Sequence, residues 1–154
     1  MRLAQYFEHA YDPKTLTVRQ IMEGAVCTVS PETRGIAIAE IMAERNFGAV
    51  PVVERDSTLV GLVSEFDLLW AIDEGKDLRH IMAEDMMTRH VVTVTEDMLV
   101  QDFIKLLQQQ HLIRTPVVKR NTLVGIATIR DAVFAYVKAM APYWSPRKGG
   151  DMSC

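Results

Sequence analysis

The feature that most constrains this chain is a nine-residue stretch that occurs twice. Residues 59–67 read Leu-Val-Gly-Leu-Val-Ser-Glu-Phe-Asp, and residues 123–131 read Leu-Val-Gly-Ile-Ala-Thr-Ile-Arg-Asp. In each copy a short apolar run ends in a hydroxyl residue, with Asp three positions later and a periodic apolar segment after it. This pattern predicts a strand that feeds directly into a helix. Two copies in a chain of 154 residues indicate an internal repeat.

The duplication extends well beyond this stretch. Residues 26–29 (Val-Cys-Thr-Val) and 50–53 (Val-Pro-Val-Val) each have a counterpart 65 residues later, at 91–94 (Val-Val-Thr-Val) and 115–118 (Thr-Pro-Val-Val). The next turn is one residue shorter in the second copy, so the last strand and helix match at a spacing of 64. A register kept through several elements indicates that a whole structural unit is duplicated.

Periodicity and turn residues predict the same element order in both copies. The elements predicted for the first copy are a helical turn at 18–22, a strand at 25–29, a helix at 32–45, strands at 50–53 and 59–63, and a helix at 65–73. The second copy repeats these strands at 91–94 and 115–118 and ends in a helix at 129–140. Each copy is therefore expected to hold three strands and to be α/β.

The same reading divides the chain into five segments. The predicted segments are an N-terminal helical extension at 1–16, the first repeat at 17–75, a linker at 76–82, the second repeat at 83–141 and a C-terminal tail at 142–154. Tyr143 and Trp144 in the tail could dock on the body of the protein or on another subunit.

Composition excludes several classes of function. A hydrophobic content of 49% allows a sizeable core, and the net charge of −3 with a pI near 5.8 argues against a nucleic-acid binder. No apolar run reaches the roughly 20 residues of a membrane span. The two cysteines, Cys27 and Cys154, make neither a disulfide framework nor a four-ligand zinc site. No metal site and no nucleophile arrangement is predicted, and a cytoplasmic location is the default expectation.

The repeated unit resembles the cystathionine-β-synthase (CBS) domain. The resemblance lies in the Pro-Val-Val strand and in the Gly-x-x-[Ser/Thr]-x-x-Asp stretch of both repeats, and it covers about residues 17–140. It implies a tandem pair of CBS domains, called a Bateman module, with an α/β (α+β) fold of two pseudo-symmetric repeats. Each repeat would be a small three-stranded mixed sheet with packed helices. The resemblance further implies homodimers and two clefts for AMP, ADP or ATP, with S-adenosylmethionine or cyclic di-AMP as further ligands.

The repeated hydroxyl residue and aspartate suit a nucleotide site. Ser64 and Thr128 place a hydroxyl at a helix N-terminus, where free N–H groups favour a phosphate. Asp67 and Asp131 could accept hydrogen bonds from ribose hydroxyls. Glycines at 61 and 125 could let a ligand approach the backbone. The alternative is that both pairs are simple helix caps, since Ser or Thr with an acid three residues later is a common helix start.

The resemblance assigns residues to each of the two clefts. Cleft 1 would use Leu62, Val63, Ser64 and Asp67 with Arg89, His90, Val91, Val92, His111 and Arg114. Cleft 2 would use Ile126, Ala127, Thr128, Arg130 and Asp131 with Gly24, Ala25, Val26, Cys27 and Ala49. Because Arg89 and Arg114 give cleft 1 more cations for a phosphate chain, we expect it to prefer AMP, ADP or ATP. Cleft 2 would take a less charged adenosyl ligand or stay empty.

Two functions from different classes fit these observations. The first is a stand-alone, non-catalytic regulatory module that senses an adenine nucleotide and acts on a separate, unidentified partner protein. The second is a scaffold that binds no ligand and uses the CBS frame to dimerise and dock a partner. An enzyme is not expected, because no acid–base or nucleophile arrangement is present, and no catalytic cofactor is predicted.

Overall fold

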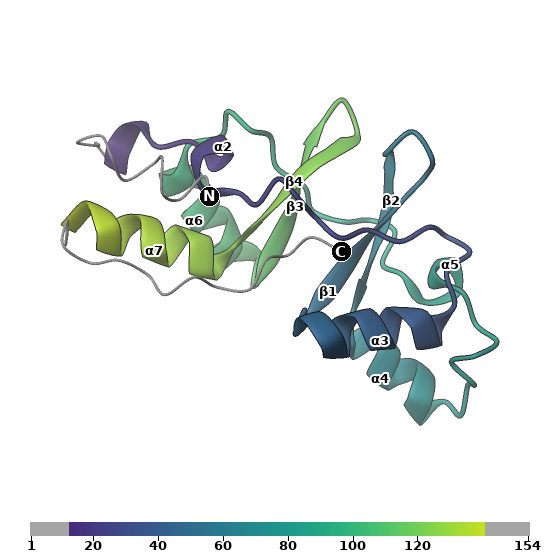
Figure 1. The fold of residues 1–154 in the computed structure, drawn as a ribbon. Helices are drawn as coiled ribbons and strands as arrows, with labels where there is room; N and C mark the ends of the chain where they lie inside the picture. Colours follow the sequence, from purple (N-terminus) through teal and green to yellow (C-terminus); the bar gives the residue numbers. More distant parts are fainter. Residues whose placement is uncertain (1–12, 141–154) are drawn as a thin grey trace. The chain divides into compact units, whose positions relative to one another are not determined.

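The fold is α+β, with two two-stranded sheets and their covering helices (Figure 1). It is known from a computed structural model that describes residues 13–140. The predicted helix at 2–11 and the predicted tail at 142–154 lie outside the described residues. The described chain divides into two compact units.

The first unit, called the C-terminal unit here, contains the second sequence repeat and the start of the chain. Its described residues are 13–24, 92–119 and 124–140. Its elements are η1 (Pro13–Thr15), α2 (Val18–Ile21), α6 (Val100–Gln110), β3 (Arg114–Lys119), most of β4 (Thr122–Thr128) and α7 (Ile129–Met140). The predicted limits of the last helix are confirmed.

The second unit, called the central unit, consists of residues 25–91 and the hairpin tip at 120–123. Its elements are α3 (Gly35–Arg45), β1 (Ala49–Val53), β2 (Leu59–Ser64), α4 (Glu65–Asp73) and α5 (Ala83–Met86). Strands β1 and β2 are antiparallel, with Val50 opposite Val63 and Val52 opposite Gly61. The predicted limits of the helix at 65–73 are confirmed.

The short first helix of each sequence repeat packs in the unit built from the other repeat. In the C-terminal unit, the N–H groups of Val18 and Arg19 in α2 donate to the carbonyls of Met98 (2.8 Å) and Glu96 (2.9 Å). Sixty-five residues later, the N–H groups of Ala83 and Glu84 in α5 donate to the carbonyls of Thr33 (2.8 Å) and Pro31 (3.0 Å) in the central unit. Helices α2 and α5 are therefore exchanged between the repeats.

The third strand predicted for each repeat is wrong. Residues 25–29 and 91–94 form no strand, and each contributes one parallel bridge, Val29 with Val52 and Val94 with Val117. Val29 donates to the Pro51 carbonyl (3.0 Å) and accepts from the Val53 N–H (2.9 Å). The next bond of that ladder would need an N–H on Pro51, which proline lacks.

A proline also prevents a third strand in the second repeat. Val94 donates to the Pro116 carbonyl (3.1 Å) and accepts from the Val118 N–H (2.9 Å). Pro116 has no N–H with which to extend the ladder toward Val92. Each repeat therefore holds a two-stranded sheet and a single bridged residue in place of a three-stranded sheet.

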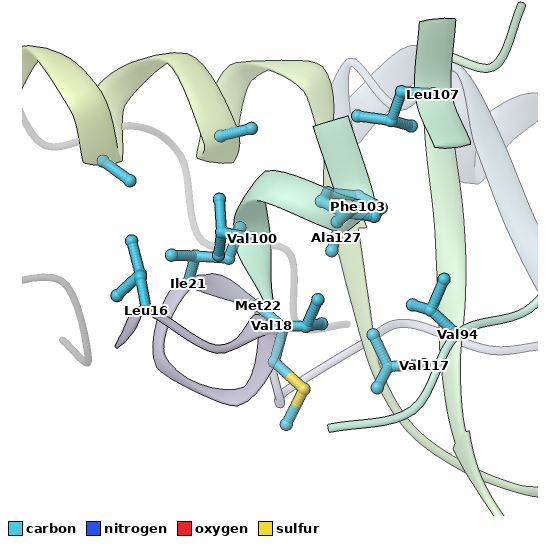
Figure 2. Packing of buried hydrophobic residues seen from close by; sticks show 12 residues of the cluster. Leu16, Val18, Ile21, Met22, Val94, Val100, Phe103, Leu107, Val117 and Ala127 are labelled. Carbon is cyan, nitrogen blue, oxygen red and sulfur yellow. The ribbon is translucent and has the colours of Figure 1, made fainter. Parts of the chain in front are cut away.

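Each unit has its own apolar core. In the C-terminal unit, side chains from the start of the chain, α6, β3, β4 and α7 meet around Phe103, which is fully buried (Figure 2). In the central unit, Ile38 occupies the equivalent position, also fully buried, among Met42, Val50 and Val63. The methionines predicted to fill core space do so in part, since Met22 and Met42 are buried and Met86 and Met87 are half-buried.

Candidate functional site

The Ser64–Asp67 pair lies where β2 ends and α4 begins. The Asp67 N–H donates to Ser64 Oγ (3.2 Å), and Asp67 Oδ2 accepts from the Ser64 N–H (2.7 Å) and the Ser64 hydroxyl (3.0 Å). These reciprocal bonds form a capping box that satisfies two backbone donors at the start of α4. The strand-to-helix transition predicted from the sequence is thus held in place by the two candidate site residues themselves.

The Thr128–Asp131 pair repeats this geometry where β4 meets α7. The Asp131 N–H donates to Thr128 Oγ1 (3.1 Å), and Asp131 Oδ2 accepts from the Thr128 N–H (2.9 Å) and hydroxyl (3.0 Å). The capping interpretation is therefore confirmed for both copies. It leaves the nucleotide interpretation open, because only Oδ2 of each carboxylate is used and Oδ1 has no hydrogen bond from a described residue.

The electrostatic setting of Asp131 is unusual for a carboxyl group. Burial raises the pKa of Asp131 from 3.8 to about 6, against the lowering effect of the Thr128 hydrogen bonds. The nearby Glu23 carboxylate raises it further, and Arg130 lowers it. A part of the Asp131 population is therefore protonated just below neutral pH, which weakens it as an acceptor for ribose hydroxyls.

The role predicted for Gly61 and Gly125 is wrong, because protein atoms occupy the space a ligand would need. A Cβ on Gly61 would lie 3.0 Å from the Thr88 carbonyl oxygen, and one on Gly125 would lie 2.8 Å from the Glu23 carbonyl oxygen. Gly61 permits a close approach of the segment that follows α5, and Gly125 permits a close approach of the segment that follows α2. That approach places Thr88 in antiparallel pairing with Leu62, and Glu23 with Ile126.

The residues predicted for cleft 1 divide between the two units. The central unit holds Leu62, Val63, Ser64, Asp67, Arg89, His90 and Val91, and the C-terminal unit holds Val92, His111 and Arg114. In the central unit, Leu62 and Thr88 exchange hydrogen bonds of 3.0 and 2.9 Å, so the following Arg89 lies beside β2. The Arg89 guanidinium donates to the Glu84 carbonyl (3.0 Å) and is exposed.

The other cations of cleft 1 lie at the ends of elements. Arg114 begins β3 and is half-buried, and His90 is exposed. His111 ends α6 in the left-handed conformation, with φ of 52°, and contributes to an apolar groove between α6 and α7. Its membership of a nucleotide cleft stays a prediction.

The residues predicted for cleft 2 are also divided. The C-terminal unit holds Gly24, Ile126, Ala127, Thr128, Arg130 and Asp131, and the central unit holds Ala25, Val26, Cys27 and Ala49. The Glu23–Ile126 bridge brings Gly24 beside β4, while Arg130 lies over the Phe134 ring at 4.5 Å. Cys27 is buried in the central core, and its membership of cleft 2 stays a prediction.

Sequence reasoning missed one polar residue of note. Thr115 is fully buried in β3, and its Oγ1 has no hydrogen-bond partner. The equivalent residue of the first repeat is Val50, so the replacement of Val by Thr at a core position was the available signal. The pairing of Glu23 with β4 and of Thr88 with β2 was also missed. The available signal was that the preceding residues, Met22 and Met87, are equivalent in the two repeats.

The comparisons with known proteins identify the family. The model of the CBS domain matches residues 18–74 and again residues 83–138. The chain belongs to the CBS domain family and carries two CBS domains, the arrangement of a Bateman module. Each of the two matched ranges contains one hydroxyl–aspartate cap and one two-stranded sheet.

Relatives of known sequence share most of the described chain. A CBS domain-containing protein of Bacillus subtilis, YhcV, is 34% identical over 116 residues, which cover 75% of this chain and 81% of that protein. An uncharacterized protein of Methanopyrus kandleri is 32% identical over 120 residues, which cover 77% of this chain and 61% of that relative's length.

Solved structures of CBS pairs have the same fold. CBSX2 from Arabidopsis thaliana, solved in complex with AMP, has a TM-score of 0.74 and 29% identity, covering 81% of this chain and 98% of that one. A CBS domain pair solved with 5′-methylthioadenosine and S-adenosyl-L-methionine has a TM-score of 0.70 and 26% identity, covering 78% and 98%.

Within residues 13–140, no helix combines the length and the apolar character that crossing a membrane requires. The same part of the chain contains no group of three His, Cys, Asp or Glu side chains placed to hold a metal ion.

Proposed function

We propose that this chain is a regulatory module that binds an adenine nucleotide or a related adenosyl ligand in clefts between its CBS repeats and signals to a separate partner protein. AMP, ADP and ATP are the first candidates, and S-adenosylmethionine and cyclic di-AMP are further ones. The support comes from the family, from the CBS pair solved with AMP and from the pair solved with S-adenosyl-L-methionine. Binding would act through different affinities for two arrangements of the protein.

One observation carries the proposal. In both capping boxes the aspartate uses a single carboxylate oxygen for the cap, and its Oδ1 has no hydrogen bond from a described residue. A half-buried carboxylate that is fixed in orientation and keeps one acceptor oxygen suits the hydroxyl pair of a ribose. Capping and ligand binding are thus compatible tasks for Asp67 and Asp131.

The proposal ranks the Asp67 cleft above the Asp131 cleft for phosphorylated ligands. Arg89 and Arg114 would supply cations for the phosphates of cleft 1. In cleft 2, the Asp131 carboxyl with its pKa of about 6 would accept ribose hydrogen bonds less well in mildly acidic solution. Cleft 2 would take a less charged adenosyl ligand or stay empty.

Titration calorimetry with AMP, ADP and ATP tests this ranking. Asparagine at position 67 keeps an oxygen for the cap but replaces the second acceptor by an amide donor, so Asp67→Asn removes ribose acceptance without removing the cap. We expect Asp67→Asn to weaken ATP binding at least tenfold, Asp131→Asn to have a smaller effect, and the exposed Asp73→Asn on α4 to have none. Equal loss from both cap variants, or loss from Asp131→Asn alone, would reject the ranking.

The proposal also includes a homodimer in the cytoplasm. Helices α4 and α7 expose large apolar side chains, with Phe66 at 64%, Trp70 at 58% and Val133 at 50% exposure. Exposed apolar patches of this kind mark interaction surfaces. The proposed function includes no catalytic step. Turnover of ATP by the pure protein that is abolished by Asp67→Asn would contradict a non-catalytic role.

The same apolar surfaces favour a second candidate function. The chain could be a scaffold that dimerises and docks a partner without binding any ligand. A thermal shift series with AMP, ATP, S-adenosylmethionine and NADH separates the two functions, because a ligand of the native state must raise its melting temperature. Stabilisation by an adenosyl compound supports the regulatory module, and no stabilisation by any of them supports the scaffold.

A further inference from the structure

The C-terminal unit carries an apolar groove between α6 and α7. The groove has a volume of about 640 Å³, and its walls are mainly aliphatic, with contributions from Ile104, Leu107, Leu112, Ile129, Val133 and Val137. Three of these side chains, Ile129, Val133 and Val137, form an exposed row along α7 at i, i+4 and i+8. An exposed apolar row beside a hollow is stabilised by an apolar cover, which removes it from water.

The start of the described chain lies at one end of this groove. η1 contacts both α6 and α7, and the Val100 N–H at the start of α6 donates to the Leu16 carbonyl (2.7 Å). In Figure 1 the purple start of the described chain and the yellow end of α7 lie at the same end of this unit. Ile104, the first wall residue on α6, is one helical turn, or about 6 Å, beyond Val100. The segment that precedes Pro13 therefore joins the described chain close to the groove.

Residues 2–11 have the pattern that a groove between two helices requires. Their apolar side chains follow the i, i+3, i+4, i+7 spacing of one helix face, with Leu3, Tyr6, Phe7 and Ala10. Ten helical residues extend about 15 Å, and the groove runs for about 12 Å along α7, from Ile129 to Val137. The segment is therefore long enough to cover the whole groove with one apolar face.

Charge favours the same occupant. The acids of the segment, Glu8 and Asp12, lie in its second half, next to η1. At that end of the groove α6 carries Lys105 and α7 carries Lys138. A segment that runs back from η1 along the groove therefore brings acids to cations.

The segment after Met140 also starts at this end of the unit, but its sequence fits the groove less well. Pro142 and Pro146 prevent a continuous helix, because proline lacks an N–H and clashes with the preceding turn. Arg147 and Lys148 would add cations to those already present on α6 and α7. The N-terminal segment is therefore the better occupant.

We propose that residues 2–11 form a helix that folds back from η1 and covers the α6–α7 groove of the same chain. Its apolar face packs on the exposed row of α7, and its polar face meets solvent. The connection to η1 strengthens this contact, because a short linker holds the segment at roughly millimolar effective concentration. The inference goes beyond the proposed function, since it needs no ligand in either cleft. A partner that binds this face of α7 must first displace residues 2–11, whereas the apolar side chains of α4 stay exposed.

A photo-crosslinking amino acid at position 133 of the full chain identifies the occupant of the groove. Mixing isotopically light and heavy chains before irradiation shows by mass spectrometry whether the crosslinked peptides come from one chain or from two. We expect crosslinks to residues 2–11 of the same chain. Crosslinks to a second copy, crosslinks to residues 141–154, or the absence of any crosslink overturn the proposal. Equal crosslinking to residues 2–11 from the exposed position 69 on α4 overturns it too.

Two matched variants of the segment measure the contact in a second way. Phe7→Glu places a negative charge on the apolar face of the proposed helix, and Gln5→Glu places the same charge on the opposite face. We expect Phe7→Glu to abolish the crosslink and to lower the melting temperature by about 2–4 °C. Gln5→Glu should change neither. An equal effect of the two variants would show that the apolar face makes no contact and would reject the proposal.

A change in the groove itself completes the test. Val133→Glu alters an exposed wall position, so Phe7→Glu should cause no further fall in melting temperature in a chain that already carries it. Leu69→Glu, a similar change at an exposed position on α4, should leave the full effect of Phe7→Glu in place. A full effect of Phe7→Glu beside Val133→Glu would place the segment elsewhere and overturn the proposal. Circular dichroism verifies that each variant is folded, and the calorimetric test of nucleotide binding is independent of these results.

Discussion

The two units show which parts of a duplicated structure stay fixed and which diverge. Both retain the hydroxyl–aspartate cap, a glycine beside an exchanged segment, and a single parallel bridge to the residue after a proline. The side chains around these features differ, with Val50 equivalent to Thr115 and Leu68 equivalent to Ala132. Backbone hydrogen bonding therefore sets the common frame, while side-chain differences give each unit its own stability and acid–base behaviour.

The largest expected difference lies in the cores. Phe103→Ala in the C-terminal unit should cost about 3–5 kcal/mol of unfolding free energy, because it leaves a large cavity in a fully buried site. The equivalent Ile38→Val in the central unit removes one methyl group and should cost about 0.5–1.5 kcal/mol. Urea unfolding measures both, with exposed Gln109→Ala on α6 as a control expected to have little effect. A Phe103→Ala cost equal to that of Ile38→Val would contradict the core described here.

The second difference is a dependence on pH that arises from Asp131. Its pKa is about 6 in the folded protein and 3.8 by its ordinary value, so the folded state prefers the protonated form. The resulting stability is present below pH 3.8 and is lost as the pH rises through about 6. The difference between the two pKa values corresponds to at most about 3 kcal/mol of unfolding free energy.

Asp131→Asn tests this prediction, because its neutral amide can still accept the cap bonds. We expect the variant to lose the Asp131 part of the pH dependence between about pH 4 and 6 and to be more stable than wild type at pH 7. Urea unfolding over a pH series measures the effect. Asp67→Asn, the equivalent change in the central unit, should leave this dependence in place, and an unchanged pH profile in Asp131→Asn would be the contrary result.

The third difference concerns the two glycines. At both positions the nearest obstacle to a Cβ is a flexible methionine side chain, Met22 at position 125 and Met87 at position 61. The backbone carbonyl oxygen behind it is closer at position 125 (2.8 Å, Glu23) than at position 61 (3.0 Å, Thr88). Gly125→Ala should therefore cost about 1–3 kcal/mol and Gly61→Ala less. Adding Met87→Ala should relieve most of the Gly61→Ala cost, whereas adding Met22→Ala should relieve less of the Gly125→Ala cost, because the Glu23 carbonyl oxygen stays in place. Full relief in both pairs would show that side chains alone cause the crowding.

The smallest expected difference comes from the exchange of Val and Thr in the strands. Thr115→Val removes a buried hydroxyl that has no hydrogen bond and should stabilise the protein by about 1 kcal/mol. Val50→Thr introduces such a hydroxyl in the other unit and should destabilise by a similar amount. Thermal unfolding of the two single variants measures this, and a loss of stability in Thr115→Val would show that its hydroxyl is paired in solution.

The sequence predicted the local parts of the fold well. The helices that follow the two caps have the predicted limits, because Ser64 and Thr128 begin them through bonds made within three residues. The strand predicted at 25–29 was wrong for a nonlocal reason. Its β-branched residues favour a strand, but the partner that would extend the ladder is Pro51.

The exchange of α2 and α5 could not be predicted from one sequence. The bonds that hold α2 join the N–H of Val18 to the carbonyl of Met98, two backbone groups with no side-chain signature. The roles of Gly61 and Gly125 were missed for the same reason, since they depend on the pairing of Thr88 and Glu23. The hydroxyl and the aspartate of each cap were predictable because their hydrogen bonds join residues within one turn of the same helix.

The exchanged helices have a consequence for how such a chain can be divided. A fragment cut at the linker after Gly75 would keep α2 without the carbonyls of Glu96 and Met98, and would lack the α5 that packs on its own core. Neither half would then be self-sufficient. Because both copies lie in one chain, α2 and α5 each find the unit that completes them within the same molecule, independently of protein concentration.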